Sequence, residues 1–165
     1  MRIGKPIALI LLIPLIALLL FSVANLEVVV IEVEGDTILL RAPATIAIEY
    51  LHSVERSKVV EVLEIKGGCV YLARILWQGY GAGMPSSTVD IPDGRVKIVN
   101  GMYEGSMGKC LGSTITVNLD YMVEGKVVVG GKTISRGIVK VTVVRGGLLD
   151  IIGFYLRYYV GDCTR

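Results

Sequence analysis

The sequence predicts an all-β domain, an antiparallel β-sandwich or barrel of about ten short strands, preceded by one N-terminal transmembrane or signal helix. Short β-branched runs recur between residues 26 and 146, and Gly, Pro, Asn and Asp separate them. No part of that range has a sustained helical period. We therefore expect a signal anchor or signal peptide over residues 1–25, a β-domain over residues 26–146 and an aromatic tail over residues 147–165.

The N-terminal segment is the most apolar part of the chain. Ile3 to Ala24 contains one charged residue, Lys5, and the first acidic residue is Glu27. A run of about 20 apolar residues is long enough to cross a bilayer as a helix. Arg2 and Lys5 favour a cytoplasmic N-terminus, which places the bulk of the chain outside the membrane. Two forms stay open: an uncleaved single-pass anchor, which the length favours, and a signal peptide cleaved after Ser22-Val23-Ala24.

The strands of the first half follow from β-branched runs between turn signals. Gly35-Asp36 and Lys66-Gly67-Gly68 indicate two hairpin turns, and Ala42-Pro43 interrupts the chain between them. The expected strands are Glu27 to Glu34, Thr37 to Arg41, Thr45 to Leu51, Lys58 to Ile65 and Cys69 to Trp77.

The second half has shorter strands and more glycine. Asn100-Gly101 is a two-residue hairpin signal, and we expect Gly105 to Gly112 to be a loop. The expected strands are Arg95 to Val99, Met102 to Glu104, Ser113 to Leu119, Tyr121 to Val123, Lys126 to Val129, Thr133-Ile134 and Gly137 to Arg145.

The tail from Gly147 to Tyr159 differs from the rest because its apolar residues fall near a helical spacing. Gly153 weakens a helix there, and the aromatic residues favour a strand. Either element would cover an open end of the β-domain, and a membrane-surface or partner-binding face is the alternative.

The charge balance excludes a nucleic-acid binder. The chain has 17 basic residues, and without Arg2 and Lys5 the remaining 15 match the 15 acidic ones. No basic stripe of the kind that tracks a phosphate backbone is present.

Three cysteines allow one internal disulfide and leave one thiol. Outside the membrane such a bond is permitted. Cys110 and Cys163 lie in glycine-rich or polar surroundings and are the expected pair, whereas Cys69 lies in an apolar run typical of a buried thiol. With a single histidine and no CxxC, we expect no metal site and no cofactor.

The chemistry is concentrated in the stretch Glu49 to Arg56, which holds the only histidine of the chain. We expect it to lie where one strand gives way to the next. A turn there would let Glu55 fold back toward His52, and a carboxylate beside an imidazole fixes its tautomer. Ser53 is not placed as the nucleophile of a known serine-hydrolase motif, and no GxSxG occurs. A corner that only fixes the strand crossover competes with a ligand- or partner-binding use, and we assign no catalytic residue.

A second unusual stretch is Gly81-Ala82-Gly83-Met84-Pro85. Two glycines permit positive φ angles, and successive backbone N–H groups in such a loop can bind an anion. The loop does not open a predicted helix, so phosphate-loop fingerprints do not apply. A rigid connection with an apolar Met84 plug is the alternative.

The pair formed by His52-Ser53-Val54-Glu55 and Gly81-Ala82-Gly83-Met84-Pro85 resembles domain-of-unknown-function family 1850, and so does Lys126 to Lys132 before a closing strand. The resemblance covers about Ala44 to Arg145. It implies an exported protein associated with tripartite ATP-independent periplasmic (TRAP) transporters of the TAXI subclass, by association only. The cysteines and the aromatic tail are additions to the family's pattern, so the resemblance implies nothing about them.

These observations lead us to expect a non-enzymatic accessory of such an organic-acid transporter, anchored in the cell membrane with its bulk extracytoplasmic. The expected binding residues are His52, Ser53, Glu55, Arg56, Gly81, Gly83, Met84 and Pro85, with a transporter membrane subunit, a solute-binding protein or a small carboxylate as partner. A small hydrolase using His52 and a structural envelope protein without ligand are the alternatives.

Overall fold

The computed structural model describes residues 12–14, 16, 26–79, 91–92, 94–147, 150–154 and 156. The chain divides into two compact units, one made of residues 28–144 and the other of residues 1–27 and 145–165. Nearly all of the β-structure belongs to the first unit. In the second, the described residues 12–14, 16, 150–154 and 156 are helical.

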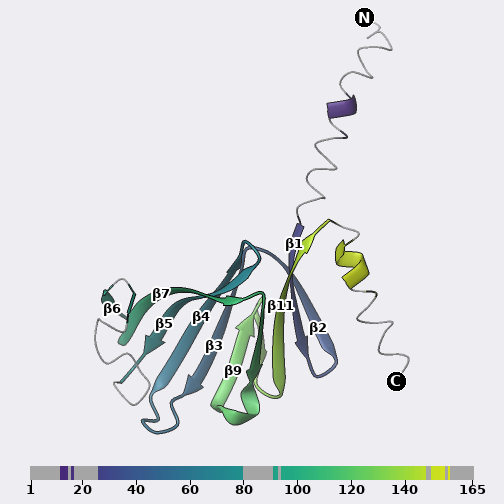
Figure 1. Cartoon of the computed structure of the whole chain (residues 1–165). Coiled ribbons are helices and arrows are strands. Elements are labelled where there is room, and N and C mark those ends of the chain that lie inside the picture. The colour runs from purple at the N-terminus through teal and green to yellow at the C-terminus, as the bar shows by residue number, and fades with distance from the viewer. Residues whose placement is uncertain are drawn as a thin grey trace, which may run out of the picture. The chain divides into compact units, whose positions relative to one another are not determined.

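The predicted antiparallel β-fold is confirmed, with two separate sheets and no closed barrel in the part of the chain described (Figure 1). A four-stranded sheet has the order β2-β1-β11-β8, and a seven-stranded sheet has the order β10-β9-β3-β4-β5-β7-β6. The strands are β1 (Leu26–Val33), β2 (Asp36–Arg41), β3 (Ala44–Leu51), β4 (Lys58–Lys66), β5 (Cys69–Trp77), β6 (Val96–Val99), β7 (Met102–Gly112), β8 (Thr114–Asn118), β9 (Val123–Val129), β10 (Lys132–Ile134) and β11 (Ile138–Gly146), with a short 3-10 helix, η2 (Leu119–Tyr121), between β8 and β9.

One apolar core joins the two sheets. Side chains with 0–1% exposure come from β1 and β11 on one side, and from β3, β4, β5 and β9 on the other. The alternation of buried and less buried residues along β9 and β11 directs every second side chain into this core. The β-branched residues of these two strands occupy most of the buried positions.

A second apolar cluster lies farther along the seven-stranded sheet and consists of Val59, Ile75, Trp77 and Ile91. Trp77 is fully buried, and its ring centroid lies 5.8 Å from that of Tyr103 on β7. Gly105 of β7 makes room for this cluster. A Cβ atom there would lie 2.5 Å from Ile91 Cδ1 and 3.4 Å from Trp77 Cζ3.

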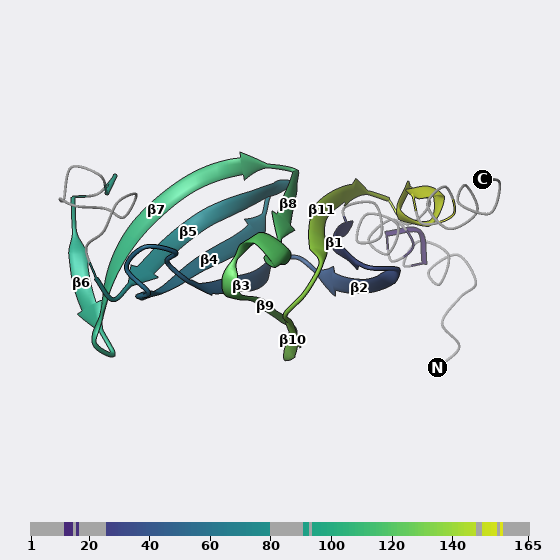
Figure 2. The ribbon, with the colours of Figure 1, turned by 90° about the horizontal axis from the view of Figure 1, so that it is seen from below.

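The prediction that Gly105 to Gly112 form a loop is wrong. These residues continue β7, which pairs with β5 along most of its length, and Figure 2 shows both strands arching together. Local composition favours a loop here because glycine weakens strands. The pairing with β5 supplies hydrogen bonds that outweigh this preference, and register shifts around Tyr71 and Arg74 accommodate the extra residues.

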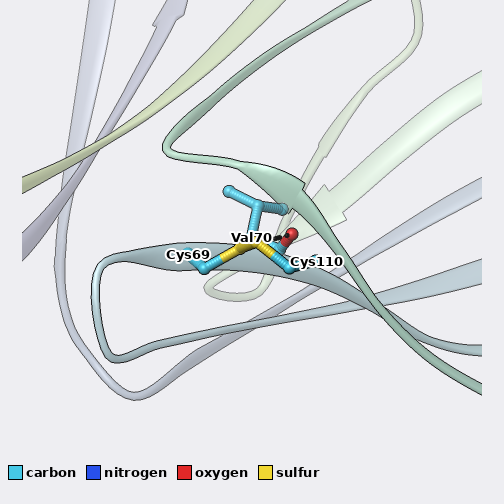
Figure 3. Close-up of a disulfide and its surroundings, with 3 residues drawn as sticks. All are labelled: Cys69, Val70 and Cys110. Atoms are coloured by element: carbon cyan, nitrogen blue, oxygen red, sulfur yellow. Dashed lines mark hydrogen bonds between the residues drawn. A yellow bond between two sulfur atoms is a disulfide. The ribbon is translucent and has the colours of Figure 1, made fainter.

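The expected Cys110–Cys163 disulfide is also wrong. Cys110 on β7 is bonded to Cys69 on β5, with a Cα–Cα distance of 6.1 Å (Figure 3). The two residues lie almost opposite each other because Tyr71 pairs with Cys110 and β5 begins at Cys69. Cys163 lies outside the described residues.

The expected membrane segment falls almost entirely on residues that the structure does not describe. No helix within the described ranges is long and apolar enough to span a bilayer. In the tail, residues 150–154 and 156 are helical. Of the two elements expected there, a helix and a strand, the structure has the helix at these residues. The Asp150 side chain accepts a hydrogen bond of 2.8 Å from the Gly147 N–H, as the acidic residue of a capping box does.

Candidate functional site

The predicted corner is the connection between β3 and β4, residues 52–57. The His52 N–H donates to the Ser57 carbonyl at 2.9 Å, and the Arg56 N–H donates to the His52 carbonyl at 2.9 Å. Arg56 has a φ of 52°, a left-handed conformation that closes the turn. The corner is therefore a hydrogen-bonded turn, and Ser53, Val54, Glu55 and Arg56 are exposed on it.

His52 contacts Glu55 through the main chain rather than through the carboxylate. The Glu55 N–H lies 3.4 Å from His52 Nδ1, a long hydrogen bond. A neutral imidazole whose Nδ1 accepts carries its proton on Nε2. A base acting through Nε2 needs the opposite tautomer, held by an acceptor at Nδ1. Within the described residues no ion pair joins His52 to Glu55.

The expected binding residues of the second stretch, Gly81, Gly83, Met84 and Pro85, lie outside the described residues. The chain that leads to them does run beside the corner. The Gln78 N–H donates to the Lys58 carbonyl at 3.1 Å, and Gln78 Oε1 accepts from the Lys58 N–H at 3.2 Å. A Cβ at Gly79 would lie 3.6 Å from Ser57 Cβ.

Three charged side chains meet beside this corner, and sequence reasoning did not single them out as a group. Glu49 of β3 accepts contacts from two lysines through the same oxygen: Lys58 Nζ lies 3.0 Å from Glu49 Oε2, and Lys126 Nζ lies 3.3 Å from it. Glu49 is 20% exposed and each lysine 43% exposed. We call Glu49, Lys58 and Lys126 the lysine pair site.

Strand register brings the lysine pair site together. Lys126 of β9 lies directly opposite Glu49 of β3, and Lys58 of β4 lies opposite Leu51, two residues farther along β3. Alternate residues of a strand share a face, so Glu49 and Leu51 point the same way as their partners. The three charged groups therefore converge on one face of the seven-stranded sheet.

The electrostatics favour a charged carboxylate at Glu49. The hydrogen bond from Lys58 lowers the pKa of Glu49 below its usual value; burial opposes this effect, and the hydrogen bond from Lys126 adds to it. The site is thus built to hold a carboxylate in its ionised form. With two ammonium groups against one carboxylate, its formal charge is positive.

The lysine pair site forms one wall of a pocket of about 520 Å³. This volume is in the range of small-molecule sites, about 300–1,000 Å³. Tyr50, Met122 and Glu124 also line it, so the pocket combines charged, aromatic and apolar surface. Among the described residues that line the pocket, Glu124 is the one further carboxylate, and it opposes the positive charge of the lysines.

Gly125 shapes the pocket floor at an irregularity between β3 and β9. The register of these strands shifts between Glu49 and Leu51, and Glu124 has a φ of 53°. A Cβ at Gly125 would lie 2.6 Å from Met122 Cβ and 3.3 Å from the Leu119 carbonyl oxygen. Only glycine fits against Leu119 of η2 and Met122 at this point.

No cluster of three or more metal-ligating side chains occurs among the residues described. The two ammonium groups of the lysine pair site offer ionic recognition and hydrogen bonding.

The chain matches the model of the family described as Domain of unknown function (DUF1850) over residues 46–135. This match spans more than half of the 165 residues. The chain belongs to the DUF1850 family. The match runs from β3 to just after β10, so it includes Glu49, the corner, Lys58 and Lys126. No curated protein and no solved structure matches the chain.

Membership of the DUF1850 family confirms the resemblance that the sequence motifs indicate. It brings no activity with it, because the family is itself described only as a domain of unknown function.

Proposed function

We propose that this DUF1850 protein is a non-enzymatic, extracytoplasmic accessory of a TRAP-type (TAXI subclass) organic-acid transporter, anchored in the cell membrane by its N-terminal segment. Its task is to bind a carboxylate group at the lysine pair site. The group belongs either to a small organic acid or to an acidic side chain of a transporter subunit or solute-binding protein.

The observation that carries this proposal is the convergence of two ammonium groups on one carboxylate oxygen. Each lysine has three N–H donors, and the contact with Glu49 uses one of them. Donors that remain free face a pocket of about 520 Å³. A second carboxylate placed there would receive charge-assisted hydrogen bonds, which are stronger than neutral ones.

The corner adds to the same binding surface. Leu51 and Lys58, the residues on either side of the corner, both line the pocket, so His52, Ser53, Glu55 and Arg56 follow the pocket wall closely along the chain. Exposed side chains of both signs at the rim provide orientation and association rate more than affinity. In this proposal the corner side chains select the partner, and the two lysines bind the carboxylate of the ligand or partner.

Two features support an extracytoplasmic location for the β-domain. Cys69 and Cys110 form a disulfide, a bond typical of oxidising environments. The apolar run from Ile3 to Ala24, with Arg2 and Lys5 close to its start, favours export of the residues that follow it.

A crosslinking pull-down from native membranes tests the accessory role. The bait is the full chain in three forms: unchanged, Lys58→Gln/Lys126→Gln, and Lys66→Gln as a control. Lys66 also pairs with a glutamate, Glu64, at 2.9 Å but does not line the pocket. Recovery of transporter subunits that is lost only in the double variant would support a carboxylate on the partner. Recovery that survives all changes would move the contact elsewhere, and no recovery would contradict the accessory role.

A further inference from the structure

A second pocket, of about 340 Å³, lies where the two sheets meet. Its walls come from Ile48 and Leu63 on the seven-stranded sheet and from Ile115 and Val117 on β8 of the other sheet. Among these aliphatic side chains lies one charged group, the carboxylate of Glu61 on β4. The volume is within the range of small-molecule sites.

Glu61 is oriented but not neutralised. The hydroxyl of Tyr50 donates to Glu61 Oε1 at 2.9 Å, which leaves Oε2 for another donor. The five ion pairs found among the described residues do not include Glu61. The residues opposite it in the sheet are Ile48 on β3 and Ile75 on β5, neither of which can donate.

Glu61 is half-buried, and the part of a carboxylate that is removed from water is costly unless a donor or a cation pairs with it. The two polar residues that line this pocket besides Glu61 are Thr116 and Asn118, and both are neutral. The chain therefore supplies the anion, the hydrogen bond that holds it in place and the apolar walls, and it supplies no counter-ion within the described residues.

We propose that this pocket binds a small primary alkylammonium ion. The ammonium group would donate to Glu61 Oε2, and the alkyl chain would pack on Ile48, Leu63, Ile115 and Val117. The pocket adjoins the first one, since Met122 lines both, but none of Glu49, Lys58 and Lys126 lines it. It takes a ligand of opposite charge, so it goes beyond the proposed function and does not depend on it.

The ligand series uses three probes that share one alkyl chain: n-pentylamine, n-pentanol and pentanoate. The protein is the full chain in lipid nanodiscs, and empty nanodiscs correct for partitioning into lipid. Binding is followed by titration calorimetry and by chemical-shift changes of the Leu63 and Ile115 methyl groups. We expect pentylamine to bind at least about tenfold more tightly than pentanol, as a charge-assisted hydrogen bond implies. Equal affinities, or no binding of pentylamine, would overturn the proposal.

Two variants test whether the Glu61 carboxylate is the group that binds the ammonium ion. Glu61→Gln keeps the size and an acceptor oxygen, and we expect it to weaken pentylamine binding about tenfold while pentanol binding changes less than about twofold. Glu64→Gln is the matched control because Glu64 lies on the same strand but pairs with Lys66 outside this pocket. Unchanged pentylamine affinity in Glu61→Gln would overturn the proposal. If that variant does not fold, the amine–alcohol difference in the unchanged chain decides alone.

Discussion

Lys126 on β9 lies directly across the sheet from Glu49 on β3, and its ammonium nitrogen is 3.3 Å from Glu49 Oε2. Lys58 reaches the same oxygen from β4 at 3.0 Å. One carboxylate thus holds two lysines at the wall of a pocket inside the segment that defines the DUF1850 family. This relationship underlies the proposed recognition of carboxylates.

Replacing the carboxylates at the lysine pair site is expected to strengthen anion binding. In Glu49→Gln the two lysines lose their internal partner, and in Glu124→Gln the opposing charge at the pocket wall disappears. Both variants should bind succinate more tightly than the unchanged chain, as measured by calorimetry. Weaker binding in both variants would contradict an electrostatic role for the lysines.

The ion pairs of Glu49 should contribute to stability in a pH-dependent way. The lysines lower the pKa of Glu49 in the folded state. The contribution is therefore fully present above the ordinary value of 4.5 and is lost as the pH falls through the lower folded-state value. Because the group is partly exposed, we expect less than about 1 kcal/mol at neutral pH. Urea unfolding of the unchanged chain and of Glu49→Gln at pH 7 and pH 3 measures this contribution. A difference in the free energy of unfolding that is larger at pH 3 than at pH 7 would contradict the prediction.

Removal of the Tyr50 hydroxyl tests the Tyr50–Glu61 hydrogen bond. Tyr50→Phe should lower the free energy of unfolding by about 1 kcal/mol because Glu61 Oε1 loses its donor. Burial first, and then the nearby Glu61 carboxylate, raise the pKa of Tyr50 far above its ordinary value of 10.0. The difference in the free energy of unfolding between the unchanged chain and Tyr50→Phe should be constant below pH 10 and shrink at higher pH. Absorbance at alkaline pH should show one fewer late-ionising tyrosine in the variant; an unchanged titration would contradict this.

The disulfide is expected to be a main source of stability. It closes a loop with a sequence separation of 41 residues. Loop entropy then predicts a loss of about 4 kcal/mol in Cys69→Ser/Cys110→Ser. Denaturant unfolding measures the loss, and peptide mapping under non-reducing conditions checks the pairing. A linked pair of peptides that contains Cys163 instead of Cys69 would contradict the structure.

Gly105 should be intolerant of a side chain, and the cause is identifiable. Gly105→Ala places a methyl group against Ile91 Cδ1 and should cost about 1–3 kcal/mol. Ile91→Val removes that Cδ1 atom, so the double variant should lose less stability than the sum of the two single changes. Thermal unfolding of the four proteins gives the coupling energy. Strict additivity would show that Ile91 is not the obstacle.

Much of the fold was predictable because period-2 alternation is a local signal. Cys69–Trp77 was predicted with its observed bounds, and Ala44–Leu51 was predicted to within one residue. The glycine-rich half of β7 was not, because its strand conformation depends on pairing with β5, a relationship that local composition does not contain. The same limit applies to Cys69, whose partner follows from that pairing.

The corner was located from the sequence because a lone histidine among polar residues between two apolar runs is conspicuous. The lysine pair site was not, because Glu49, Lys58 and Lys126 are ordinary surface charges until strand register is known. Glu49 lies near the end of β3, Lys58 at the start of β4 and Lys126 in the middle of β9. Bringing them together needed the pairing of β3 with a strand more than 70 residues away. The expected contribution of Gly81, Gly83, Met84 and Pro85 stays a prediction.

The most direct test of the central claim is calorimetric titration of the full chain in lipid nanodiscs with succinate, and with the uncharged succinamide as the matched ligand. We predict that succinate binds and succinamide does not, that Lys58→Gln/Lys126→Gln weakens succinate binding at least about tenfold, and that Lys66→Gln leaves it unchanged. Succinate binding that persists in the double variant, or fails to appear in the unchanged chain, would contradict recognition of free carboxylates at the lysine pair site.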